Sequence, residues 1–216
     1  MNTDFARQQM IEQQVRAWAV LDTRVLNGLK EVPRELFVAE GYEALAFADT
    51  QIPLGHGQLM MTPTIEGRVL QALGLVGAEN VLEIGTGSGF LTACLAKLSA
   101  HVTSIDIHDD FLVHAKRRLA ECDITNIDLI KMNGTEELPG DKFDAIAVTG
   151  SLQTLDQRLV DALNPGGRLF VVVGNSPAMS ATRVTRYDEA AWQSDTLFET
   201  DLAPLVDGAS PPQFLF

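Results

Sequence analysis

The sequence predicts an α/β protein built on a doubly wound sheet of seven strands, mostly parallel and ending in an antiparallel hairpin. Three observations lead to this fold class. Short apolar runs alternate with segments of helical periodicity from residue 81 to residue 173, as in a parallel sheet with crossover helices. Closely spaced glycines separate the first of these runs from its helix. Two β-rich runs near the carboxyl end flank a short turn, which indicates the hairpin.

Length and composition are those of a globular protein. The chain has 216 residues, of which 46% are hydrophobic and 21% charged, enough for one domain with an appendage. We expect residues 1–78 to form an N-terminal helical preface and residues 79–216 to form the core, the two making one compact unit. No run reaches the ~18 apolar residues of a membrane span, and the first residues lack the apolar segment of a secretory signal. The expected compartment is the cytoplasm, with no membrane partner.

The net charge and the cysteine and histidine residues argue against a nucleic-acid-binding protein and against a metal site. The formal net charge of -13 argues against a nucleic-acid partner, because such binding depends on lysine and arginine. Two cysteines, Cys94 and Cys122, fall in segments of helical periodicity, and we interpret them as reduced packing residues. The four histidines show neither metal-ligand spacing nor a cysteine companion, so no metal site is predicted; they are His56, His101, His108 and His114.

The helical preface is predicted from apolar spacing and capping residues. Two helices are expected before Pro33, the second capped by Asp22, with apolar positions at Ile11, Val15, Trp18, Val25, Leu29 and Val32. Residues 52–58, rich in proline and glycine, are predicted to form a structured turn. Thr62 and Pro63 are then expected to be the N-cap and first residue of a third helix.

The glycine-rich stretch from Val81 to Phe90 predicts a strand, a turn and a helix. Gly85 and Gly87 permit backbone angles closed to other residues, and Gly89 is expected to let the helix pack closely on the strand. The spacing is G-x-G-x-G, which differs from the dinucleotide pattern G-x-G-x-x-G. Glu83 would place a negative charge beside any phosphate and so favours a cationic ligand. The alternative is a glycine turn in another α/β domain, with Glu83 solvated.

The second strand, Val102 to Ile107, contains the next candidate. Asp106 lies about 20 residues beyond the glycine turn, where an acid can accept both hydroxyls of a ribose. The alternative is an acid that merely ends a strand.

The remaining elements follow in order. A helix with a solvated basic face is expected over residues 112–119, and strands over residues 127–130, 143–149 and 168–173, the last after a turn at 164–167. Residues 182–187 and 192–198 are expected to form the hairpin, and residues 207–212 an irregular tail.

The acid at position 83 with its three glycines resembles motif I of the class I, Rossmann-like S-adenosylmethionine-dependent methyltransferases. The runs Glu31 to Val38 and Ile52 to Gln58, with Pro204 to Val206, look like protein-L-isoaspartate O-methyltransferases, and this resemblance covers nearly the whole chain. It implies S-adenosylmethionine as cofactor and an isoaspartyl protein or peptide as acceptor. It also implies an acceptor-side loop within residues 1–78. The implied cofactor residues are Glu83, Gly85, Thr86, Gly87, Ser88, Gly89, Asp106, Ile107, Asn133, Gly134 and Thr149.

Two features of the implied site differ from the family pattern. Asn133 stands where the isoaspartyl family commonly has aspartate near the adenine amino group, and it keeps an acceptor oxygen. Where the family typically has T-I-S after the Gly-Gln pair, this chain has Leu59-Met60-Met61. Met61 therefore occupies the position of the serine that helps to hold the acceptor carboxylate. Its neighbour Thr62 is either a substitute hydroxyl or only a helix cap.

Three functional hypotheses remain open at this point. The first is carboxyl O-methylation of isoaspartyl residues for protein repair, which needs no general base because the acceptor is ionised at pH 7. The second is methylation of another, more apolar acceptor. The third is a non-catalytic protein that binds S-adenosylmethionine. The sequence leaves the oligomeric state undetermined.

Overall fold

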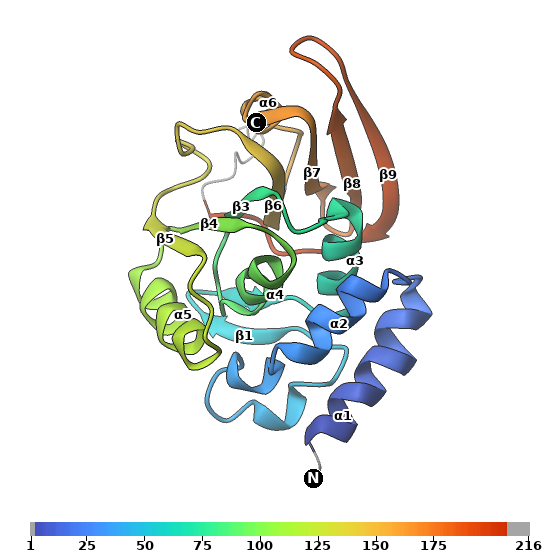
Figure 1. Ribbon diagram of the computed structural model, residues 1–216, viewed down its shortest axis with the longest axis vertical. Coiled ribbons are helices and arrows are strands. Elements are labelled where there is room, and N and C mark those ends of the chain that lie inside the picture. Colours follow the sequence, from blue (N-terminus) through green and yellow to red (C-terminus); the bar gives the residue numbers. More distant parts are fainter. Residues whose placement is uncertain (1–2, 207–216) are drawn as a thin grey trace, which may run out of the picture.

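The computed structural model describes residues 3–206 and confirms the predicted α/β fold class (Figure 1). Its main sheet has seven strands in the order β5-β4-β3-β6-β7-β8-β9. The strands from β5 to β7 run parallel, whereas β8 and β9 are antiparallel and form the predicted terminal hairpin. The strands are β3 Asn80–Ile84, β4 His101–Asp106, β5 Ile127–Lys131, β6 Phe143–Leu152, β7 Leu163–Asn175, β8 Ala178–Arg186 and β9 Trp192–Thr200. The predicted tail at 207–212 lies outside the described residues.

Alternate residues of the central strands face opposite sides of the sheet and enter two separate cores. Val81 of β3 joins a core shared with four helices, α2 Thr23–Glu31, α3 Pro63–Leu73, α4 Phe90–Leu98 and α5 Asp109–Glu121. Leu82 and Ile84 enter the other core, which the short helix α6 Gln157–Asp161 and nearby loops complete. The longer helices therefore cover one face of the sheet. None of the helices within residues 3–206 combines the length and apolar character that crossing a membrane requires.

The helical preface packs into the first of these cores. It begins with α1 Thr3–Met10, continues as a π-helical segment Ile11–Val15 and a 3-10 turn Arg16–Trp18, and leads into α2. Asp22 caps α2 as predicted, its side chain accepting a hydrogen bond of 2.9 Å from the amide of Arg24. Further 3-10 turns follow at Arg34–Leu36 and Glu43–Leu45. The preface fits closely against α3, where a Cβ added to Gly67 would lie 2.7 Å from Val15 Cγ1.

Residues 52–60 form a two-stranded antiparallel hairpin, which corrects the predicted turn. Its strands are β1 Ile52–Gly55 and β2 Gln58–Met60, and Ile52 pairs with Met60. The turn residues His56 and Gly57 have φ angles of 51° and 71°. Positive φ at both central residues gives a turn whose twist matches that of paired strands, so a proline- and glycine-rich segment can still form a ladder.

Two further expectations from the sequence are corrected. Arg118 of α5 is not part of a solvated face, because its guanidinium reaches back to donate to the carbonyls of Phe37, Val38 and Ser88 at 3.0 to 3.3 Å. The turn expected at 164–167 lies inside β7, which begins at Leu163 opposite Phe143. Gly166, with φ of 82°, lets the strand bulge there without ending.

Candidate functional site

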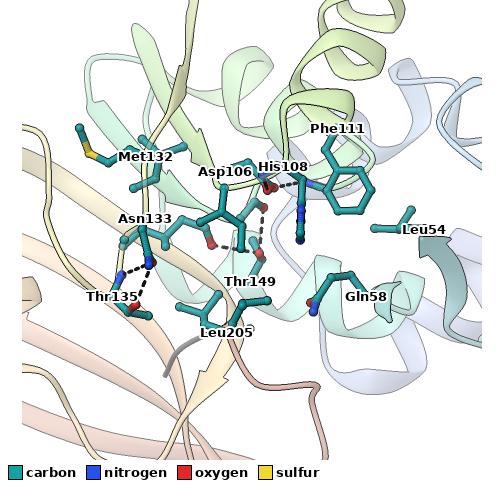
Figure 2. Close-up of a pocket in the computed structure, with 18 of the residues that line it drawn as sticks. Leu54, Gln58, Asp106, His108, Phe111, Met132, Asn133, Thr135, Thr149 and Leu205 are labelled. Atoms are coloured by element: carbon teal, nitrogen blue, oxygen red, sulfur yellow. Dashed lines mark hydrogen bonds between the residues drawn. The ribbon is translucent and has the colours of Figure 1, made fainter. Parts of the chain in front are cut away.

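The main cavity lies at the carboxyl ends of the central strands, with the β1–β2 hairpin forming one wall (Figure 2). Strand order changes direction between β3 and β6, and open α/β sheets bind ligands at such a switch point. The space in this cavity, including the part that is open to solvent, is about 590 Å³. It is lined by Leu54, Gln58, Leu59, Ile84, Gly85, Gly87, Ile105, Asp106, Ile107, His108, Phe111, Met132, Asn133, Gly134, Thr135, Thr149, Gly150, Leu205 and Val206.

The glycine loop after β3 forms the floor of this cavity. Gly85 and Gly87 have φ angles of 99° and 51°, as the sequence predicted for these two positions. Thr149 of β6 lies against Gly85, and its hydroxyl is 2.8 Å from the Gly85 carbonyl oxygen. The sequence predicted that Gly89 lets the following helix pack closely on the strand, and this is wrong. An added Cβ at Gly89 would lie 2.8 Å from Ala115 Cβ, so the glycine permits the close approach of α5 instead.

Asp106 ends β4 with a carboxylate that joins two loops. Its Oδ2 accepts from the Gly87 amide at 3.0 Å, and its Oδ1 accepts from the His108 amide at 2.9 Å. Each carboxylate oxygen offers two lone pairs, so both oxygens keep capacity for another donor. The side chain lines the main cavity beside Ile107, and a diol could bind there.

Asn133 lies on the side of the main cavity away from Leu54 and Gln58 (Figure 2), and Gly134 lines the same cavity. The Asn133 side-chain oxygen accepts from both the amide and the hydroxyl of Thr135, at 3.1 and 2.8 Å. The acceptor predicted for an adenine amino group is thus already engaged within its own turn. Gly134 packs on β3, where an added Cβ would be 2.5 Å from Ile84 Cγ2.

An inner cavity of about 310 Å³ adjoins the main one and shares Gly85, Gly87 and Thr149 with it. Several predicted residues face this inner cavity rather than the main one. Its lining consists of Leu54, Leu59, Met60, Met61, Glu66, Glu83, Gly85, Thr86, Gly87, Ser88, Leu91 and Thr149. The hydroxyls of Thr86 and Ser88 are occupied, by Ser104 Oγ at 2.7 Å and by the Phe90 amide at 3.2 Å. These bonds help to shape the loop, and each hydroxyl keeps further hydrogen-bonding capacity, because it has one donor and two acceptor lone pairs.

Glu83 is fully buried in the inner cavity. Its Oε2 accepts from the hydroxyls of Thr92 and Ser104, while Oε1 has no hydrogen-bond partner. Burial raises the pKa of Glu83 to about 8, although the bonds from Ser104 and Thr92 act in the opposite direction. A carboxyl group with this pKa is mostly neutral at pH 7, and the negative charge expected from the sequence would require a cation beside it.

This protonation predicts a pH-dependent stability. The folded pKa of Glu83, about 8, exceeds the unfolded value of 4.5, so the folded state binds more protons between these values. Its contribution to the free energy of unfolding is then complete below pH 4.5 and is lost as pH rises through 8, by up to about 1.4 kcal/mol per pH unit. Urea denaturation from pH 6 to 9 should show a shallower decline for Glu83→Gln than for the natural protein. Equal declines for the two proteins would contradict the raised pKa of Glu83.

Arg34 and Glu66 form a buried ion pair that the sequence analysis missed. Arg34 Nη1 contacts both carboxylate oxygens of Glu66, at 2.6 and 2.8 Å, and both side chains are at most 2% exposed. Arg34 also donates to the carbonyls of Ala46 and Met61, at 2.9 and 2.8 Å. The pair thereby fixes the backbone just before α3. Arg34 lies within the run Glu31 to Val38, which carried the family resemblance, but nothing local identified its partner.

The two predicted acceptor residues face different cavities. Met61 is 5% exposed and lines the inner cavity. Thr62 lines an outer groove made of Trp18, Asp49, Gln51, Leu59, Thr62, Thr64, Ile65 and residues 200–203. Its hydroxyl accepts from the Ile65 amide at 3.4 Å and pairs with Thr64 Oγ1 at 2.9 Å, which confirms its role as helix cap. Leu59 alone of these residues lines the main cavity, the inner cavity and the outer groove.

Comparison with known proteins gives one consistent relationship. The family model for protein-L-isoaspartate(D-aspartate) O-methyltransferase matches residues 5–210. The protein-L-isoaspartate O-methyltransferase of Methanoculleus marisnigri is 38% identical over 169 residues, which are 78% of this chain and 77% of the relative. The enzyme of the same name from Koribacter versatilis is 36% identical over 214 residues, 97% of this chain and 96% of the relative.

Solved structures agree on the fold. A Plasmodium falciparum structure described as a protein-L-isoaspartate O-methyltransferase in complex with S-adenosyl-L-homocysteine has a TM-score of 0.80. The match covers 92% of this chain and 97% of that one, at 21% identity. With the family model spanning nearly all described residues and relatives above 30% identity over most of their length, the chain belongs to the protein-L-isoaspartate(D-aspartate) O-methyltransferase family.

Proposed function

We propose that this protein is an S-adenosylmethionine-dependent O-methyltransferase that methylates the carboxylate of L-isoaspartyl residues in damaged proteins or peptides. The observation that carries the proposal is the main cavity, where Asp106 and the glycine loop meet at the switch point between β3 and β6. Membership of the family supplies the acceptor. The net charge of -13 supports a protein acceptor over a nucleic acid. The proposed compartment is the cytoplasm, and the two free cysteines support it.

The lining of the two connected cavities fits this cofactor. Asp106 would accept the ribose hydroxyls, and the backbone of Gly85 and Gly87 would lie along the methionine portion. The unpartnered, buried Oε1 of Glu83 would meet an ammonium group that reaches the inner cavity, and a cation there would lower the pKa of Glu83 and ionise it. Asn133 and Gly134 would border the adenine, with Ile107 packing beside it.

Catalysis would then depend on alignment. When bound, S-adenosylmethionine supplies a methyl group on a sulfonium for transfer to a carboxylate oxygen. That oxygen is already anionic at pH 7, so this chain needs no general base and has only to hold the acceptor in line. We propose that residues 1–78 provide the acceptor side, since Trp18, Asp49, Leu59 and Thr62 of the outer groove all come from that part. Residues 79–216 would provide the cofactor side.

Cofactor binding gives the first test. Asp106→Ala should weaken binding of S-adenosylmethionine by about 1.5–3 kcal/mol, or roughly 10- to 150-fold, because it removes the charged acceptor for the ribose. Asp106→Asn, which keeps one acceptor oxygen, should lose less. Isothermal titration calorimetry measures all three proteins, with Asp128→Ala as control, since Asp128 lies on β5 and is exposed. Unchanged affinity in Asp106→Ala would remove the ribose assignment.

The acceptor is tested with labelled S-adenosylmethionine and matched isoaspartyl and aspartyl peptides. We expect the natural protein to methylate the isoaspartyl peptide weakly, and Met61→Ser to raise kcat/KM by about tenfold, because a hydroxyl bond to a carboxylate contributes ~1.5–3 kcal/mol. Met179→Ser is the matched control: Met179 is also 5% exposed but lines none of the three cavities, so it should give no gain. Leu59→Thr with Met61→Ser should exceed the single variant, and activity that falls on Met61→Ser would contradict this pocket assignment.

One observation favours a second candidate function, methylation of a more apolar acceptor. Leu59, Met60 and Met61 form an apolar wall of the inner cavity, and Leu59 is 37% exposed where the three cavities meet. Tight cofactor binding without methylation of isoaspartyl peptide by any variant would favour this acceptor class. Failure of every acceptor tested would leave the third hypothesis, a non-catalytic cofactor-binding protein.

A further inference from the structure

Folding brings His56 beside His108 and Asp110, the last of which lies 54 residues further along the chain. His56 occupies the turn of the β1–β2 hairpin, His108 immediately precedes α5, and Asp110 lies in the first turn of that helix. One donor atom of each lies within 4.8 Å of the other two. Across residues 3–206 no other three histidine, cysteine or acidic side chains converge in this way.

The contacts within this cluster leave donor atoms for a further partner. His56 Nε2 is 2.9 Å from Asp110 Oδ2, within hydrogen-bond distance. The His56 and His108 rings stack at 4.0 Å between centroids with an angle of 8°. His108 Nε2 is shielded from solvent and has no hydrogen-bond partner. An ionised carboxylate and an unpaired imidazole nitrogen thus lie side by side.

We propose that His56, His108 and Asp110 form a binding site for a divalent transition-metal ion, Zn²⁺ being the best match. Two imidazoles and one carboxylate are ligands that Zn²⁺ accepts, and three protein ligands leave a position for water. Donor atoms at 2.0–2.2 Å from zinc lie closer together than 4.8 Å, so the side chains must close by an ångström or more. The His56 and Asp110 side chains are exposed, and we assign the closing movement to them. Because a metal lies in the plane of each imidazole, binding would break the ring stack.

Such an ion would tie the hairpin to α5 at the rim of the main cavity. Leu54 and Gln58 of the hairpin border that cavity together with His108 and Phe111 (Figure 2), and Leu59 also lines it. A metal ion that bridges the hairpin and α5 would slow the exchange of a ligand held between these two elements. This consequence rests on the proposed function, whereas metal binding does not, so the two can fail separately.

The test is titration of the full chain with ZnCl₂ at pH 7.5 by calorimetry, with the Co²⁺ absorption spectrum as a second readout. We expect one equivalent to bind, and His56→Gly, His108→Ala and Asp110→Asn each to weaken binding at least tenfold, as loss of a direct ligand should cost more than loss of an outer-shell partner. His56→Gly suits the positive φ and so keeps the fold.

His101→Ala is the matched control, because His101 forms the other histidine–aspartate pair, with Asp128 at 3.0 Å. Its affinity for Zn²⁺ should equal that of the natural protein. Absence of binding, or equal loss in His101→Ala and His56→Gly, would overturn the proposal. If zinc binds but the dissociation rate of S-adenosylhomocysteine is unchanged, the predicted effect on ligand exchange is wrong while the metal site stands.

Discussion

Arg34→Ala is expected to lower the free energy of unfolding by about 3–5 kcal/mol, because it leaves a buried carboxylate without its partner. The Arg34 guanidinium makes five contacts in the interior: two to Glu66, one each to the carbonyls of Ala46 and Met61, and one with the Phe90 ring at 4.9 Å. Burial raises the pKa of Glu66 to about 7 even with Arg34 present. Urea denaturation at pH 8, where Glu66 is ionised in the natural protein, measures this loss, because without Arg34 the carboxyl group must either stay charged in the interior or take up a proton on folding.

A double variant separates the ion pair from its surroundings. Arg34→Met with Glu66→Leu removes both charges and fills similar space, and replacement of a buried pair by apolar residues is often neutral. We expect it to recover most of the loss. Arg24→Ala, which breaks an exposed pair with Asp22, should cost at most about 1 kcal/mol. A double variant no more stable than Arg34→Ala would show that the carbonyl contacts, not the unpaired charge, account for the loss.

Local patterns were enough to predict the sheet and the glycine loop. The run Val81 to Ile84, the positive φ of Gly85 and Gly87, and the caps Asp22 and Thr62 each depend on a few neighbouring residues, and each was predicted correctly. The hairpin at 52–60 was predicted as a turn because its ladder has few pairs and a proline inside one strand.

Long-range contacts account for what the sequence could not show. Arg34 and Glu66 are 32 residues apart, and two charged residues in separate helical segments are expected at the surface unless the fold is known. The neutral state of Glu83 depends on its burial against α4, which raises the pKa despite the opposing hydrogen bonds from Thr92 and Ser104. Met61 and Thr62 are adjacent yet face different cavities, because β2 ends at Met60 and α3 begins at Pro63.

Gly85→Ala is expected to cost roughly 2–6 kcal/mol of stability and to abolish measurable cofactor binding, through two separable effects. The φ of 99° strains any residue with a side chain, and the added Cβ would lie 2.1 Å from Thr149 Oγ1. The threonine cannot turn away freely, since its hydroxyl is within hydrogen-bond distance of the carbonyls of Ile84 and Gly85.

Gly77→Ala isolates the first effect, because Gly77 has nearly the same φ, 100°, and no atom within 4 Å of an added Cβ. It should lose about 1–3 kcal/mol and retain cofactor affinity. Gly85→Ala combined with Thr149→Ala removes the second effect and leaves the first, since the nearest atom of residue 149 is then Cβ at 3.5 Å, an ordinary contact. Its unfolding free energy should approach that of Gly77→Ala. If Gly85→Ala alone already equals Gly77→Ala, the close approach of β6 to the glycine loop contributes nothing, and the fit of the loop against Thr149 must be looser than the distances indicate.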